Sequence, residues 1–139
     1  MPELTAHHVG ITVSDLDRAV EFYRDVLGLD VLAEFSVGGD AFATGVDVPG
    51  ASADFAHLDA GDIRLELVSY DPEGESQSDP TLNEPGASHV GLGVDDVQAV
   101  YDSLPEDVET LSDPQTTESG TTILFVRDPE GNLVEILDA

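Results

Sequence analysis

The chain of 139 residues contains no cysteine, no tryptophan and no lysine. Without cysteine it can form no disulfide and no thiolate metal site, and it has no cysteine nucleophile. No apolar run approaches the ~18 residues of a membrane-spanning helix, and the acidic start of the chain lacks the features of a signal peptide. We therefore expect a cytoplasmic protein that does not associate with membranes, and any bound metal must have imidazole and carboxylate ligands.

Basic side chains are almost as scarce as thiols. Thirty acidic residues face four arginines, which gives a net charge of −26. Nucleic acid is a poor partner for such a chain, because binding to phosphates requires basic surface. The acidic residues are spread along the whole sequence, a pattern that resembles proteins of extreme halophiles. The alternative is an acidic protein from a mesophile.

Transfer from molar KCl into dilute buffer is therefore expected to lower the melting temperature. The screening length, the distance over which charges still repel one another, is about 3 Å at 1 M salt and about 10 Å at 0.1 M. The carboxylates therefore repel one another more strongly in dilute buffer. Calorimetry across a KCl series measures the effect. A melting temperature that does not respond to KCl would contradict the halophile interpretation.

The length suits one domain covering residues 1–139. A polar stretch rich in proline and glycine, 71–86, has the composition of a linker, and 40–51 is ambiguous. Elsewhere, alternating polarity predicts strands and amphipathic spacing predicts helices. The expected strands are 7–13, 30–37, 53–58, 62–69, 88–94, 107–111, 121–127 and 132–137, and the expected helices are 16–27 and from Asp95-Asp96 to about Leu104.

The order of elements repeats along the chain. Residues 8–15 (HVGITVSD) and 89–96 (HVGLGVDD) are identical at five of eight positions, and each segment leads into a predicted helix. Each half also ends in a strand with one glutamate between apolar neighbours, Glu66 in the first and Glu135 in the second. These features predict an α+β fold of two βαβββ modules, residues 5–70 and 87–139, joined by the linker.

Strand periodicity indicates where the polar side chains of the repeat point. Each module places one histidine and one glutamate on the sheet face away from its helix, next to glycines that leave room for a ligand. A single strand histidine is more often structural, and a single strand glutamate more often lies at the surface. Because the set occurs twice in register, we expect one divalent ion, Zn²⁺, Ni²⁺, Co²⁺, Mn²⁺ or Fe²⁺, bound by His8, Glu66, His89 and Glu135.

Three further side chains lie close to this set in the sequence. His57 faces the same side as Glu66 if the hairpin pairs it with Arg64, and both then line a cavity, whereas a shift of one residue reverses its face. Arg64 is a candidate anchor for an anionic substrate group, or a salt-bridged surface arginine. We interpret His7 as structural, pointing to the helix side or the strand edge.

Long segments of the sequence are typical of one family. Residues 8–28, the strand around Glu66, residues 88–92 and residues 125–136 together resemble the vicinal-oxygen-chelate superfamily across nearly the whole chain. That superfamily includes glyoxalase I, methylmalonyl-CoA epimerase, extradiol dioxygenases and bleomycin and fosfomycin resistance proteins. The motifs are specific for the superfamily and not for one of its activities.

The resemblance implies a cup-shaped, eight-stranded mixed sheet, usually in a homodimer. It places the metal ligands at His8, Glu66, His89 and Glu135, a set similar to that of glyoxalase I, with Zn²⁺, Ni²⁺ or Co²⁺ favoured. It implies a lyase or isomerase that moves a proton of a small oxygenated substrate through a metal-stabilised enediolate, with Glu135, or else Glu66, as the base. An epimerase of methylmalonyl-CoA type, an extradiol dioxygenase and a non-catalytic binder are the alternatives.

Overall fold

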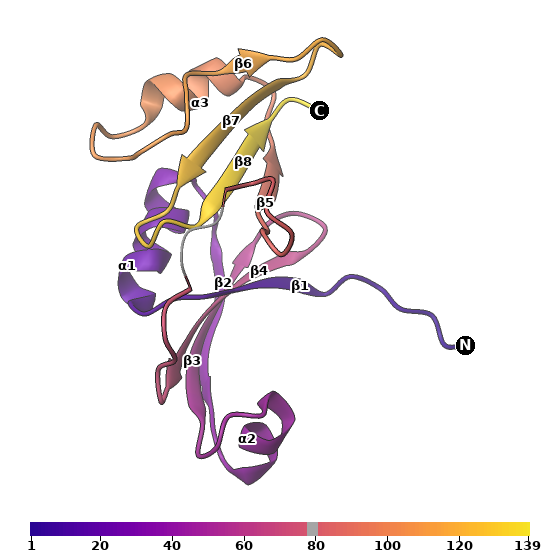
Figure 1. Ribbon diagram of the computed structural model, residues 1–139, viewed down its shortest axis with the longest axis vertical. Helices are drawn as coiled ribbons and strands as arrows, with labels where there is room; N and C mark the ends of the chain where they lie inside the picture. Colours follow the sequence, from indigo (N-terminus) through magenta and orange to yellow (C-terminus); the bar gives the residue numbers. More distant parts are fainter. Residues whose placement is uncertain (78–80) are drawn as a thin grey trace. The chain divides into compact units, whose positions relative to one another are not determined.

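The computed structural model describes residues 1–77 and 81–139. The chain divides into two compact units, 1–76 and 77–139, and each is described here by itself. The described strands form two four-stranded sheets, one in each unit, accompanied by short helices (Figure 1). The predicted α+β class and the two-module organisation are confirmed. None of the described helices is long and apolar enough to cross a bilayer.

The sheet of the first unit has the strand order β1-β4-β3-β2. Strand β1 runs parallel to β4, and the other two pairings are antiparallel. A hairpin turn joins β3 to β4, where the Gly61 amide donates to Asp59 Oδ1 at 2.9 Å. The elements are β1 (His8–Thr12), α1 (Leu16–Glu21), the π-helical turn η1 (Phe22–Val26), β2 (Val31–Val37), α2 (Asp40–Val46), β3 (Ser52–Asp59) and β4 (Arg64–Asp71).

The helix predicted over 16–27 is present as α1 continued by η1. Its first turn is capped by Asp15, whose carboxylate accepts from the Arg18 amide at 3.1 Å, and Gly28 follows its end at φ +78°. The helix contacts β3 and β4. The buried apolar side chains of this part of the unit are Ala19, Val20, Phe22, Tyr23, Ala56, Leu58, Leu65 and Leu67.

The opposite face of the first sheet carries a second apolar cluster, which the sequence pattern did not predict. Ala53, Phe55 and Val68 are buried there, and Phe42 and Tyr70 pack against them. Phe42 belongs to α2, which lies in the stretch 40–51 that the sequence left ambiguous. Strand alternation places Val68 on the face of Glu66, away from α1, and Phe42 of α2 covers that end of the sheet.

The sheet of the second unit has the order β5-β8-β7-β6 and repeats the topology of the first. Its helix is capped as predicted, because Asp96 Oδ1 accepts from the Ala99 amide at 3.1 Å. Val97, Leu124, Val126, Val134 and Ile136 are its buried apolar residues. The elements are β5 (Val90–Gly93), α3 (Val97–Ser103), β6 (Gln115–Thr116), β7 (Thr122–Arg127) and β8 (Leu133–Leu137).

The prediction of a strand at 107–111 is wrong. Only an isolated bridge joins Thr110 to Val126, and the outer strand of this sheet is the two-residue β6. The backbone between Glu109 and Leu111 still exchanges hydrogen bonds with β7. Prolines at 105 and 114, which have no amide hydrogen, bracket this short segment and prevent a longer ladder.

Candidate functional site

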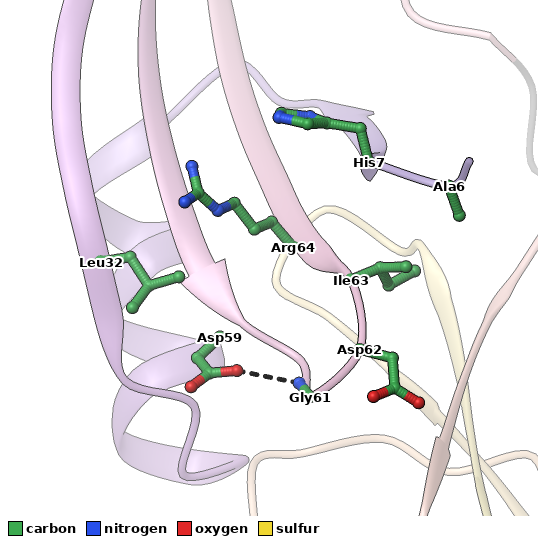
Figure 2. Close-up of a pocket in the computed structure, with 8 residues that line it drawn as sticks. All are labelled: Ala6, His7, Leu32, Asp59, Gly61, Asp62, Ile63 and Arg64. Carbon is green, nitrogen blue, oxygen red and sulfur yellow. Dashed lines mark hydrogen bonds between the residues drawn. The ribbon is translucent and has the colours of Figure 1, made fainter. Parts of the chain in front are cut away.

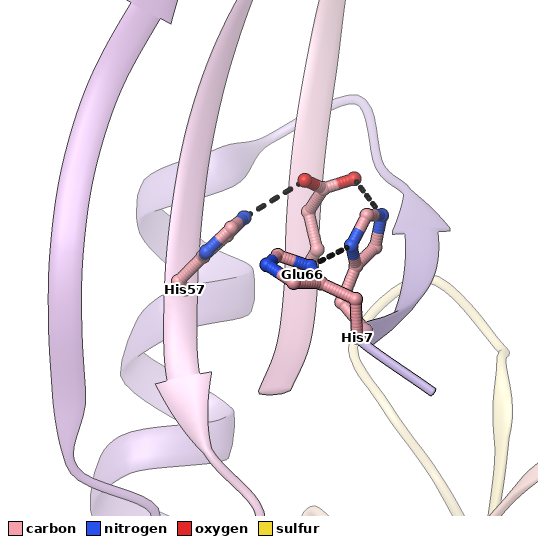
Figure 3. Close-up of polar contacts among 4 residues, drawn as sticks. His7, His57 and Glu66 are labelled. Carbon is pink, nitrogen blue, oxygen red and sulfur yellow. Dashed lines mark hydrogen bonds and ion pairs between the residues drawn. The ribbon is translucent and has the colours of Figure 1, made fainter. Parts of the chain in front are cut away.

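In the first unit, a histidine of β1 and a glutamate of β4 meet on the sheet face away from α1. His8 Nε2 lies 3.4 Å from Glu66 Oε2. On the next strand, β3, His57 pairs directly with Glu66, and His57 Nε2 lies 2.8 Å from Glu66 Oε1 (Figure 3). We call His8, His57 and Glu66 the first half-site. Both oxygens of its carboxylate therefore face an imidazole.

His57 lies on the face of Glu66, one of the two faces left open for it, but the pairing considered for it is wrong. Asp59 is the residue opposite Arg64, and His57 is opposite Glu66. The side chain is only 7% exposed, and its Nδ1 has no hydrogen-bond partner in the described part of the chain. Because an ionised carboxylate only accepts hydrogen bonds, His57 Nε2 carries the hydrogen and donates it to Glu66.

A glycine makes room for the carboxylate of the first half-site. Gly10 is the β1 residue opposite Glu66, and a Cβ at this position would lie 3.3 Å from Glu66 Oε2. An alanine here would push against the carboxylate. The corresponding glycine of the second unit, Gly91, is less tight, since its Cβ would lie 3.9 Å from Glu135 Oε1.

His7 lies beside the first half-site and not toward the helix. Its Nδ1 is 2.8 Å from His8 Nδ1, so that one ring donates to the other, and the two rings meet edge to face at 5.1 Å. If His8 Nδ1 is the donor, the lone pair of His8 Nε2 is available to a metal ion. Ligating histidines commonly have their second nitrogen held in this way.

The second unit contains the equivalent pair from the repeat, which we call the second half-site. His89 Nε2 lies 3.3 Å from Glu135 Oε1, and the two side chains are 38% and 18% exposed. Phe125 is opposite Glu135 in the β7–β8 ladder, and its ring meets that of His89 at 5.1 Å. The structure thus forms both predicted His–Glu pairs, one in each unit.

The donors of each pair suit a divalent ion. Imidazole nitrogen and carboxylate oxygen are normal ligands of Zn²⁺ and similar ions at ~2.0–2.2 Å. Separations of 3.3 and 3.4 Å exceed the ~2.7–2.9 Å of a charge-assisted hydrogen bond, and they leave room for an ion bound to both atoms. Within the described residues, no three histidine, aspartate or glutamate side chains together form a metal-binding group. In the first half-site, His57 is the third candidate ligand, but its Nε2 is already hydrogen-bonded to Glu66.

Arg64 lies at the edge of the first half-site, in a shallow hollow that also contains His7, Asp59 and Asp62 (Figure 2). Its guanidinium forms no ion pair with any residue in the described part of the chain, whereas Arg24 is paired with Asp25 at 2.8 Å. Neither of the other two arginines forms an ion pair within the described residues either. The salt-bridged alternative is therefore not seen for Arg64, and its role as an anion anchor stays a prediction.

Comparison with known families gives a match along most of the chain. Residues 5–136 fit the family described as Glyoxalase/Bleomycin resistance protein/Dioxygenase superfamily. The chain belongs to this superfamily. The resemblance inferred from the sequence segments is thereby confirmed.

Individual members of the superfamily differ in the activities for which they are named. A 2-epi-5-epi-valiolone epimerase from Actinomyces sp. is 33% identical, over 97% of this chain and 79% of the relative. A probable lactoylglutathione lyase from Synechocystis sp. is 27% identical, over 94% and 92%. The crystal structure of a glyoxalase family protein from Bacillus cereus has a TM-score of 0.87 at 21% identity, covering 99% of this chain and 95% of that one. The last likeness establishes the fold alone.

Proposed function

We propose that the protein is a metal-dependent lyase or isomerase that moves a proton between neighbouring carbons of a small oxygenated substrate. The observation that supports this most is the repeated pair, in which each half presents an imidazole nitrogen and a carboxylate oxygen 3.3–3.4 Å apart. We propose that His8, Glu66, His89 and Glu135 bind one divalent ion, with Zn²⁺, Ni²⁺ or Co²⁺ preferred. Four protein ligands leave coordination positions for a substrate.

A bound divalent ion supplies Lewis-acid stabilisation of negative charge that develops on substrate oxygens. The proton itself is moved by the chain. Glu135 takes it from one carbon and returns it to the neighbouring carbon, acting first as base and then as acid. Glu66 is the alternative base, but both of its oxygens already face imidazoles.

Arg64 would orient the substrate by pairing with an anionic group. Replacing it with glutamine is expected to raise KM by about 10-fold with little change in kcat, because a charged hydrogen bond contributes roughly 1.5–3 kcal/mol and is weakened here by exposure. Steady-state kinetics at low salt measures this. Arg18→Gln, an exposed arginine of α1, is the matched control. An unchanged KM for Arg64→Gln would remove the anchor.

Epimerisation is the second candidate, favoured by the relative that is 33% identical. It needs the same elements, a carboxylate base and a stabilised anion, but returns the proton to the carbon that lost it. The two reactions therefore differ in where the proton is added. Deuterium from D₂O appears at the original carbon in epimerisation and at its neighbour in isomerisation.

The experiment that tests the function combines metal analysis with a screen in D₂O. Purified protein would be loaded with Ni²⁺, Zn²⁺ or Co²⁺ and incubated with 2-oxoaldehyde–thiol adducts, CoA esters and a valiolone epimer. We expect one ion per chain and metal-dependent conversion of one of these classes, with deuterium in the product to the extent that the protonated base exchanges with solvent. Metal binding without conversion of any of them would favour the non-catalytic binder. Light scattering would test the proposed homodimer.

A further inference from the structure

We propose that His57 is a positioning residue, which holds the carboxylate of Glu66 in place and thereby makes the two glutamates of the site unequal. Glu66 stays fixed as a ligand, while Glu135 is free to move and exchange a proton. The inference rests on the proposed function. It assigns different roles to Glu66 and Glu135, which occupy equivalent positions in the sequence repeat.

The contact between His57 and Glu66 is short, and its surroundings hold both side chains. The ring is 7% exposed and the carboxylate 14% exposed, so water competes little for their 2.8 Å hydrogen bond. Phe35 contacts the imidazole edge to face at 5.1 Å. Gly10 lies close to the other carboxylate oxygen, where a Cβ would be 3.3 Å away. The carboxylate therefore has one hydrogen-bonded oxygen and one oxygen directed at His8.

The second module provides an internal comparison. In the ladder of strands β7 and β8, the residue opposite Glu135 is Phe125, just as His57 is opposite Glu66 in β3 and β4. A phenyl ring donates no hydrogen bond to a carboxylate. Among the described residues, His89 is the only one that forms an ion pair with the Glu135 carboxylate, at 3.3 Å. The two modules thus present the same proposed ligands, but only Glu66 accepts a hydrogen bond from the residue opposite it in the neighbouring strand.

A histidine at position 57 has a cost that a phenylalanine would avoid. His57 Nδ1 is buried and has no hydrogen-bond partner among the residues that the structure describes, and an unsatisfied buried polar atom destabilises the fold. Packing beside the carboxylate needs only an aromatic ring and no ring nitrogen, since Phe125 occupies the equivalent position in the second module. The function of the imidazole is therefore at Nε2, in the bond to Glu66.

Exchanging the two residues tests this inference. His57→Phe gives the first module the environment of the second, and it is expected to weaken Ni²⁺ binding about 10- to 100-fold, the usual effect of losing the support of a ligand. His57→Gln should restore most of the affinity, because its amide nitrogen is placed near Nε2. His57→Asn is the matched control, since its shorter amide does not reach Glu66. Calorimetric titration with Ni²⁺ measures all four proteins, and thermal melting confirms that each is folded.

The reverse change, Phe125→His, places a hydrogen-bond donor opposite Glu135. We expect Ni²⁺ affinity to stay the same or rise while deuterium exchange into substrate slows, because the carboxylate is now held. Equal affinities for the Phe, Gln and Asn variants at position 57, all folded, would mean that His57 only packs and would overturn the inference.

A measurement without metal separates this inference from the proposed function. Long-range ¹H–¹⁵N correlation of the histidine rings in the metal-free protein is expected to show His57 with its hydrogen on Nε2. If the wild-type protein binds no ion, the proposed function fails, yet this tautomer still supports the contact with Glu66. A ring with its hydrogen on Nδ1 would overturn the positioning role whatever the metal result.

Discussion

Glu135→Gln is expected to lower the rate of proton transfer by about 10²- to 10⁴-fold, the usual contribution of a general base. The amide keeps the size of the side chain and an oxygen ligand, but it does not accept the proton. On β8, Glu135 stands between two buried residues, Val134 and Ile136, so the strand should keep its position in the variant. NMR of the reaction in D₂O, which follows both product formation and deuterium uptake, measures the rate.

Glu66→Gln is the matched control for this variant. It is the same substitution at the equivalent position of the other repeat, and because Glu66 is held by His57 we expect it to retain far more activity. Metal content must be measured for both proteins, so that loss of the ion is not taken for loss of the base. Retained exchange in Glu135→Gln together with its loss in Glu66→Gln would assign the base to the first module.

Removing the histidine of either His–Glu pair is expected to cause a large loss of metal affinity. His8→Ala and His89→Ala should each weaken Ni²⁺ binding by more than about 100-fold, since even changes in the residues that support a ligand cost ~10- to 100-fold. Equilibrium dialysis with metal analysis measures this. The effects should be similar, because the two residues occupy the same position in the repeat.

His7→Ala provides the control for these two variants. His7 is adjacent to His8 and bonded to its Nδ1, but the proposal gives it no bond to the ion, so its replacement should cost no more than the ~10- to 100-fold of a supporting residue, less than that of His8. If His8→Ala and His89→Ala bind Ni²⁺ as tightly as the wild type, neither histidine binds the ion and the proposed site is wrong.

The sequence was sufficient for the parts of the site that depend on strand periodicity. A period of two assigns a face to each side chain, and the duplicated motif indicated that His8 and Glu66 would meet, as would His89 and Glu135. The hydrogen bond from His57 could not be derived in this way. It depends on the register of the β3–β4 hairpin, which the turn geometry sets and the polarity pattern does not.

Other differences have equally local causes. Helix α2 has only seven residues, one of them Gly45, and too few turns for an amphipathic pattern. The apolar cluster beneath it, with Val68 on the face of Glu66, was missed for the same reason. Strand alternation places Val9 on the same face of β1 as Ile11, but Val9 is 40% exposed because β1 is an edge strand of its sheet.

The most direct test of the account is a crystal structure of the protein loaded with Ni²⁺, combined with the number of ions bound per chain in solution. The account predicts a single ion per chain with one imidazole and one carboxylate from each repeat among its ligands. Two ions per chain, each bound to one half-site alone, or an ion bound elsewhere while these four side chains remain unligated, would contradict it.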